Sequence, residues 1–152
     1  MNKVGIRTFL ARVLLTLSAI MLGVDPLRID LSPTHLLNPS WPAHARLHEA
    51  WLLSTGALVT CVALYFIWFY RGQHRFGLTL AAVLLGCIDV GFFIAAATMP
   101  LYGGILTDPA VAAMQPGNGL MFGYSANLVV FIIAGGLILV GWALGRSQIA
   151  PP

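Results

Sequence analysis

Charged side chains are scarce in this sequence. Only 9% of its 152 residues are charged, eight Lys or Arg against five Asp or Glu, whereas 59% are hydrophobic. Soluble domains usually carry about 25% charged residues, so this chain cannot cover a soluble globule with charge. The composition therefore excludes an ordinary soluble enzyme and a disordered protein. The net charge of +3 comes without any basic run, which excludes nucleic acid as a partner.

Cysteine is scarce as well. Cys61 and Cys87 are the two cysteines, and both fall within apolar stretches. Their number and position exclude a disulfide framework, so we interpret them as small apolar fillers. The sequence also lacks a GxGxxG motif, a phosphate-loop lysine and the period-two alternation of membrane-spanning strands.

Long apolar stretches are abundant instead, at residues 9–24, 47–70, 76–99 and 120–144. A helix needs about 20 residues to cross the hydrocarbon core. The first stretch reaches that length if its helix starts near Val4 and Arg12 extends towards the headgroups. We predict one all-α domain over residues 1–152, an antiparallel up-down four-helix membrane bundle with spans at about 4–24, 45–70, 76–99 and 120–145.

The basic residues predict the orientation of this bundle. Six of the eight lie at the N-terminus, between the second and third stretches, or near the C-terminus: Lys3, Arg7, Arg12, Arg71, Arg75 and Arg146. The positive-inside rule then places both termini in the cytoplasm, which we expect for a protein of a bacterial inner membrane. The basic N-terminus also fits a cleaved secretory signal. The candidate cleavage site at residues 17–19 lies inside the apolar run, so we expect a retained helix.

The densest polar cluster is the segment WPAHARLHEAW at residues 41–51. His44 and His48 are four residues apart and share one face of the predicted helix, with Trp51 beside them. Such a pair can bind a metal ion if a third protein ligand is present, and Asp89 is the only apparent candidate. A haem needs a single axial histidine, because the porphyrin supplies four ligands. On spacing alone, an anchor at the membrane interface is the favoured interpretation of this cluster, and a ligand site is the alternative.

Two further polar residues lie within the apolar stretches. An aspartate at the bilayer centre, such as Asp89, costs at least about 2.5–3.5 kcal/mol on insertion scales. We therefore expect Asp89 to face the bundle or another subunit and to have a partner, with Arg12, His48 and Asn127 as candidates. A clamp between helices and a ligand-orienting or catalytic role both remain open. Asn127 similarly fits helix–helix hydrogen bonding.

A loop rich in proline and glycine, residues 99–119, contains Tyr102 and connects the last two spans. Its turn residues predict an irregular segment. We expect it to cover the mouth of the bundle on the same side as His44 and His48.

Three segments resemble styrene oxide isomerases, small four-span membrane enzymes that bind haem b. Residues 45–48, Ala-Arg-Leu-His, are similar to the family's Ala-Arg-Ala-His segment at the start of helix two. Residues 89–93, Asp-Val-Gly-Phe-Phe, are similar to its Asn-Val-Gly-Phe-Tyr segment, and residues 100–109 resemble its proline- and glycine-rich loop. The order and spacing of the spans agree over nearly the whole chain.

The resemblance implies that His48 ligates a ferric haem, that the iron is a Lewis acid for epoxide opening, and that trimers hold haem between neighbours. Other positions depart from the family. Ser54, Leu85 and Phe93 stand where the family has asparagine, aspartate and tyrosine, and Asp89 replaces an asparagine. These departures put styrene oxide itself in doubt as the substrate.

Three hypotheses follow. The first is a haem-dependent isomerase or lyase, an intramolecular oxidoreductase, acting on a small hydrophobic epoxide-like substrate in a homo-oligomer. Its expected cofactor-binding residues are His48 as metal ligand with Trp41, His44, Arg46 and Trp51, and its expected catalytic residues are Asp89, Tyr102 and Asn127. The second is a non-catalytic membrane subunit or hydrophobic-ligand-binding module. The third is a non-haem metal or proton-coupled function using His44, His48 and Asp89.

Overall fold

The first membrane-length helix is longer than the sequence predicts. The structure, a computed structural model, describes residues 3–114 and 119–146. Helix α1 (Lys3–Ala19) runs through a π-helical turn, η1 (Ile20–Val24), into α2 (Asp25–Asp30) without leaving helical geometry. Asp25 and Pro26 suit the first turn of α2, because an acidic side chain and a proline are both favoured there. The helix therefore continues six residues beyond the predicted end.

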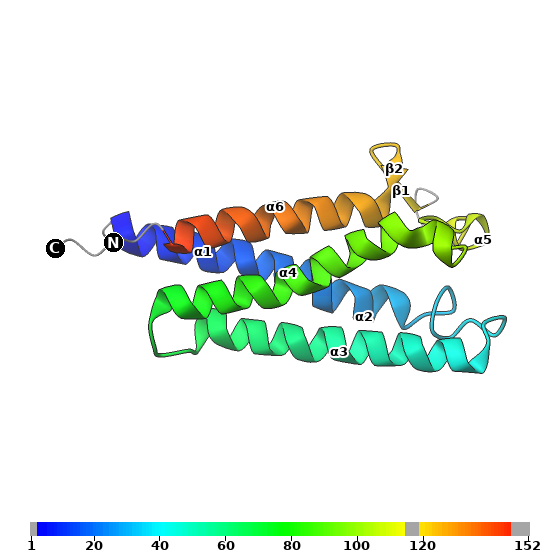
Figure 1. The fold of residues 1–152 in the computed structure, drawn as a ribbon, viewed down its shortest axis with the longest axis horizontal. Helices are drawn as coiled ribbons and strands as arrows, with labels where there is room; N and C mark the ends of the chain where they lie inside the picture. The colour runs from blue at the N-terminus through cyan, green and yellow to red at the C-terminus, as the bar shows by residue number, and fades with distance from the viewer. Residues whose placement is uncertain (1–2, 115–118, 147–152) are drawn as a thin grey trace.

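Three more long helices follow: α3 (Ala43–Trp68), α4 (His74–Thr98) and α6 (Ala126–Arg146). Among the residues that the structure describes, four helices are long and apolar enough to cross a membrane: Gly5–Asp30, Ala43–Trp68, His74–Leu101 and Ala126–Arg146. The predicted all-α four-helix bundle is confirmed, and the chain has the character of a membrane protein. Figure 1 shows these helices lying along the long axis of the molecule, with successive helices running in opposite directions.

Short elements occupy the long connection before α6. A 3-10 turn, η2 (Met99–Leu101), extends α4, and α5 (Pro109–Ala112) is a single turn. Strands β1 (Leu120–Met121) and β2 (Tyr124–Ser125) form an antiparallel hairpin. Its two turn residues, Phe122 and Gly123, have φ angles of +54° and +82°, the left-handed region that such hairpins use. This hairpin moves the start of the fourth span from residue 120 to Ala126.

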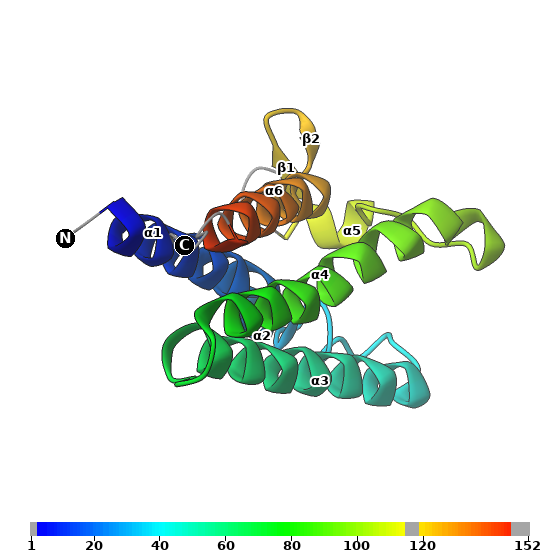
Figure 2. The same cartoon turned by 60° about the vertical axis from the view of Figure 1, so that its left-hand side comes forward.

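The two ends of the bundle differ in shape. We call the end that carries Lys3, the α3–α4 connection and Arg146 the short-loop end. The end that carries residues 31–42, 99–114 and 119–125 is the long-loop end. Helix α6 packs along α1, and α4 lies between α3 and α6. Helices α3 and α4 are close at the short-loop end and diverge towards the long-loop end (Figures 1 and 2).

Small residues let α1 and α6 approach closely. A Cβ atom on Gly141 would lie 3.1 Å from Leu15 Cγ and 3.3 Å from the carbonyl oxygen of Ala11. Close backbone approach of this kind is a common basis of helix association in membranes. The buried core is correspondingly rich in alanine and leucine: Ala11, Leu15, Ala19, Leu22, Ala63, Ile67, Leu78, Ala81, Ala82, Leu85, Ala134 and Ile138.

Arg12, one of the basic residues near the predicted first span, lies at the short-loop end. Its guanidinium stands 5.6 Å from the centre of the Trp68 ring, and its Nη2 lies 3.4 Å from Nδ1 of His74. Trp68 Nε1 donates to Thr16 Oγ1 at 2.9 Å. These contacts link α1, α3 and α4.

Candidate functional site

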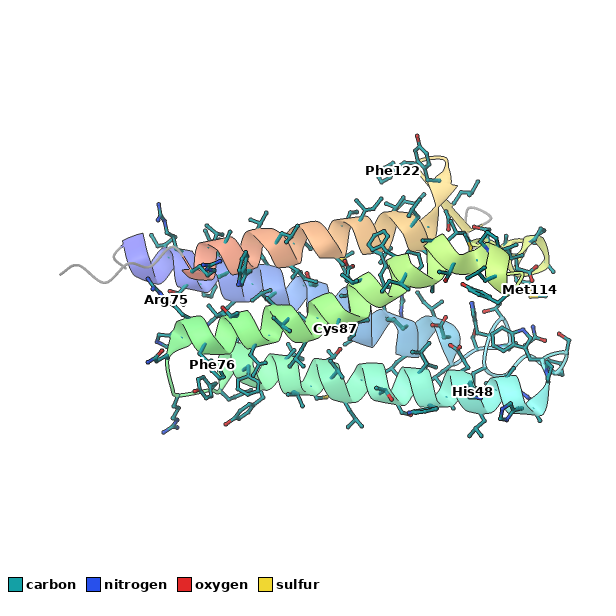
Figure 3. The ribbon with its side chains drawn as sticks, in the orientation of Figure 1. His48, Arg75, Phe76, Cys87, Met114 and Phe122 are labelled. Atoms are coloured by element: carbon teal, nitrogen blue, oxygen red, sulfur yellow. The ribbon has the colours of Figure 1, made fainter. Side chains whose placement is uncertain are left out.

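The predicted histidine pair is formed on α3. Pro42 precedes the helix with an extended ψ of 140°, so the helix begins at Ala43. His44 lies in its first turn, and His48 lies one turn further along on the same face. Their Nε2 atoms are 3.0 Å apart, and their rings stand edge to face with centroids 4.5 Å apart. Both side chains are exposed. Figure 3 shows His48 near the long-loop end of α3, on the outer side of the bundle.

Trp51 lies beside this pair. Its ring centroid is 6.1 Å from that of His48, the two planes are tilted by 32°, and the residue is 67% exposed. Arg46 is half-buried, and no hydrogen bond or ion pair of its guanidinium is seen within residues 3–114 and 119–146. Three of the expected cofactor-binding residues, His44, His48 and Trp51, therefore share one exposed surface, which we call the α3 histidine face.

Trp41 belongs to a different cluster. Its ring meets that of His35 edge-on, with centroids 6.0 Å apart and planes at 77°. Both residues line a cavity of about 270 Å³ at the long-loop end. The structure thus separates Trp41 from the α3 histidine face, because Pro42 turns the chain between Trp41 and the helix.

Asp89 is buried in the middle of the bundle, with 6% of its surface exposed. It faces Gly135 on α6, where a Cβ atom would lie 2.7 Å from Asp89 Oδ2. Within the described residues, Asp89 Oδ1 has no hydrogen-bond partner. None of the three expected partners bonds to it: Arg12 contacts His74 and Trp68, and His48 contacts His44. Because Gly135 has no side chain, there is space beside it for the Asp89 carboxyl group.

Tyr102 and Asn127 come together near the start of α6. Both line a second cavity of about 150 Å³, and Asn127 also lines the larger one. The Tyr102 hydroxyl donates to the carbonyl oxygen of Ala95 at 2.6 Å. Asp89 lines neither cavity. The three expected catalytic residues therefore do not converge on one site in a single copy of the chain.

The connection before α6 forms part of the cavity walls. Ile105 and Leu106 line both cavities, and Thr107 and Asp108 line the larger one. These residues line the cavities together with His35 and Asn127, and neither His44 nor His48 lines them. That the connection covers the mouth of the bundle stays a prediction. Residues 115–118 of the expected lid lie outside the described residues.

Sequence reasoning missed an acid–base pair at the larger cavity. His35 Nδ1 lies 2.8 Å from Thr34 Oγ1 and 3.6 Å from Asp30 Oδ1. The signal was the turn Ser32-Pro33-Thr34-His35 directly after a helix that ends in aspartate. Backbone hydrogen bonds from Leu36 to Asp30 and from His35 to Ser32 hold this turn in place.

A metal ion without a porphyrin would find few protein ligands among the described residues. No group of three or more His, Cys, Asp or Glu side chains comes together in the part of the chain that the structure describes. The His44–His48 pair supplies two nitrogen ligands, and Asp89 is on another helix facing Gly135. The third hypothesis, with a shared His44, His48 and Asp89 site, is not supported by this arrangement.

A family model described as "Family of unknown function (DUF6640)" matches residues 14–150. No curated protein and no solved structure matches the chain. The matched range covers the α3 histidine face, both cavities and Asp89.

Proposed function

The chain belongs to the DUF6640 family of unknown function, and on that premise we propose that it is a haem-dependent membrane isomerase. Its substrate would be a small hydrophobic epoxide-like molecule. The support comes from two sources: the segments that resemble styrene oxide isomerases, and the surroundings of His48. The proposal includes insertion in a bacterial inner membrane with both termini in the cytoplasm, because six of eight basic residues lie at the short-loop end.

The observation that carries the proposal is the accessibility of His48. Its imidazole is exposed on the α3 histidine face, and among the described residues the hydrogen-bond contact of its Nε2 atom is with His44 Nε2 alone. An axial haem ligand needs one accessible imidazole nitrogen, and no further protein ligand. His44 would have to turn aside, since its Nε2 stands 3.0 Å away, where a metal bound to His48 would lie.

The surroundings of His48 suit a porphyrin that lies against the surface of one copy of the chain. They do not suit a porphyrin enclosed within that copy. The two cavities, of about 270 and 150 Å³, are too small to enclose a haem. The α3 histidine face offers the exposed Trp51 ring as apolar surface. Arg46, whose guanidinium has no partner within the described residues, can pair with a propionate.

A bound ferric haem would supply a Lewis acid that polarises the epoxide oxygen. The chain's own residues would orient the substrate. Asn127 has a side-chain amide that can hydrogen-bond to a polar group, and it lies where the two cavities meet. Tyr102 can contribute its ring, because its hydroxyl is already bonded to Ala95. Asp89 lines neither cavity, so in this proposal it is a helix-packing residue and not a catalytic one.

An oligomer is part of the proposal. In one copy, the α3 histidine face and the cavity beside Asn127 are separate surfaces. Residues near His48 that point outward are large and apolar, including Leu47, Leu52 and Leu58 at 63–69% exposure. We include a homotrimer, as in the family that the chain resembles, with the cofactor held between copies.

The visible absorption spectrum tests the haem assignment. Full-length protein made with ample haem and purified in detergent should show a Soret band. His48→Ala should abolish it, and His44→Ala should leave it nearly unchanged. His74→Ala is the matched control, because His74 is an exposed histidine at the other end of the bundle. Colourless wild-type protein, or an unaltered spectrum in His48→Ala, would refute the assignment.

Isomerase activity needs a second measurement. We expect wild-type protein to convert a small epoxide to its carbonyl isomer, followed by gas chromatography, and His48→Ala to lose this conversion. If the protein binds haem but converts none of the tested epoxides, the haem assignment stands and the isomerase assignment is contradicted.

A specific observation favours a second candidate, a non-catalytic hydrophobic-ligand-binding module. The two adjoining cavities exist within one copy and share Ile105, Leu106 and Asn127 in their walls. They need no cofactor and no second copy. This candidate predicts colourless protein that still binds a small ligand at the long-loop end.

A further inference from the structure

The larger cavity at the long-loop end contains an acid–base pair that the proposed isomerase does not use. Its walls come from three separate parts of the chain: residues 35–41, residues 105–112 and the start of α6. His35 is the only imidazole among its lining residues. The cavity lies away from the α3 histidine face, since neither His44 nor His48 lines it.

The two nitrogens of His35 have different surroundings. Nδ1 faces Thr34 Oγ1 at 2.8 Å and the Asp30 carboxylate at 3.6 Å. A nearby carboxylate favours the tautomer with the proton on Nδ1, as in other Asp–His pairs. Nε2 has no protein partner in the part of the chain that the structure describes. His35 lines the cavity, and with the proton on Nδ1 its Nε2 is the hydrogen-bond acceptor of the ring that has no protein partner within the described residues.

The remaining walls combine polar and apolar groups. The Asn127 amide has no hydrogen bond within the described residues, and the Ser125 hydroxyl makes only a long one, 3.4 Å to the carbonyl oxygen of Leu106. Trp41, with its ring edge-on to His35, and Ile105 supply apolar surface. Glu49 is close enough to interact electrostatically with both Asp30 and His35.

We propose that this cavity binds a small alcohol, a molecule with an apolar body and one hydroxyl group, and that the hydroxyl donates its hydrogen bond to His35 Nε2. Asn127 then donates to the hydroxyl oxygen. The apolar body lies against Trp41, Ile105 and Leu106. Asp30 is a positioning residue that fixes the tautomer and orientation of His35.

The size of the cavity sets the size of the ligand. A volume of about 270 Å³ corresponds to about nine water volumes of ~30 Å³ each. A single aromatic ring with a short alcohol substituent fits this space, whereas a lipid or a porphyrin does not. Benzyl alcohol is therefore a suitable probe. Toluene has nearly the same shape and lacks the hydroxyl.

Photolabelling with competition tests the site in the full chain. A benzyl alcohol carrying a diazirine group is irradiated with the detergent-solubilised protein, and labelled residues are mapped by mass spectrometry. We expect labels within residues 35–41 and 105–112. Benzyl alcohol and toluene are then added as competitors. Replacing His35 by Leu removes one hydrogen bond to the alcohol. The ratio of the concentrations at which benzyl alcohol and toluene displace the label should therefore shift about 3–10-fold in favour of toluene.

Matched variants assign this shift to His35. His74→Leu removes an exposed histidine far from the cavity and should leave the ratio unchanged. Asp30→Asn keeps the size of the side chain and should shift the ratio in the same direction as His35→Leu, which also covers the case in which His35→Leu does not fold. Labelling confined to other regions, labelling that benzyl alcohol does not displace, or an unchanged ratio in both folded variants would overturn the proposal.

The site is independent of haem. In His48→Ala the labelling pattern and the competition ratio should equal those of the wild type, whatever that substitution does to the Soret band. A colourless wild-type protein that shows the expected labelling would refute the haem assignment and leave the alcohol site intact. A haem-containing protein without labelling at the cavity would do the reverse.

Discussion

The two ends of the bundle use polar residues in opposite ways. At the short-loop end, Arg12, Trp68, Thr16 and His74 contact one another and link three helices. At the long-loop end, His35 and Asn127 line a cavity, and each has a polar atom without a hydrogen-bond partner within the described residues. A polar group that hydrogen-bonds within the protein stabilises the fold, whereas a polar group without a protein partner can bind a ligand. This difference supports the proposals that put ligand binding at the long-loop end.

Helix packing also differs between the two ends of the bundle. Most of the buried residues lie in the short-loop half and the middle of the bundle, where glycine and alanine bring α1 and α6 together. At the long-loop end, α3 and α4 diverge, and the connection before α6 fills only part of the space (Figure 2). We expect substitutions that enlarge side chains to be costly in the first region and mild in the second.

The largest expected effect is that of Gly141→Leu. The new side chain would collide with Leu15 and with the backbone of Ala11, forcing α1 and α6 apart. Overpacking of this kind typically costs about 1–3 kcal/mol of unfolding free energy. Gly136→Leu on the same helix is the matched control, because no atom lies within 4 Å of a Cβ at that position. Thermal unfolding in detergent should show a lower midpoint for Gly141→Leu only, and equal losses would contradict the close packing.

Polar residues in the middle of the bundle should give intermediate effects of opposite sign. Ser18 donates to the carbonyl oxygen of Ala134 at 3.0 Å, so Ser18→Ala should lower the unfolding free energy by about 0.6 kcal/mol.

Asp89 Oδ1 has no partner within the described residues, so Asp89→Asn should raise the unfolding free energy by about 1 kcal/mol. Denaturant titrations in detergent measure both changes. A marked loss of stability in Asp89→Asn would reveal a partner for the carboxylate.

The smallest expected effect is at the hairpin before α6. Phe122 is 84% exposed and has a φ of +54°, a conformation that asparagine tolerates better than phenylalanine. Figure 3 shows Phe122 projecting away from the bundle. Phe122→Asn should change the unfolding free energy by less than about 0.5 kcal/mol. A larger loss of stability, measured as for Gly141→Leu, would show that the hairpin contributes to the core.

The sequence by itself determined the fold class. Four apolar stretches of membrane length leave the backbone no alternative to helices in lipid, because every N–H and C=O group must be satisfied within its own segment. The pairing of His44 with His48 was also predictable, since residues four apart share a helix face whatever the helix packs against. The extension of the first span to Asp30 and the hairpin before Ala126 were missed, because Asp25-Pro26 and Phe122-Gly123 fit more than one local structure.

Only the tertiary structure decided which polar residues meet. Asp89 faces Gly135 on α6 and none of its three expected partners, because the rotation of α4 against α6 depends on how small residues interlock along both helices. Trp41 joins His35 because the chain turns between residues 31 and 42, and no periodicity records that turn. Local spacing fixes contacts within one helix, but contacts between elements depend on packing of the whole bundle. The cavity at His35 is a product of that packing.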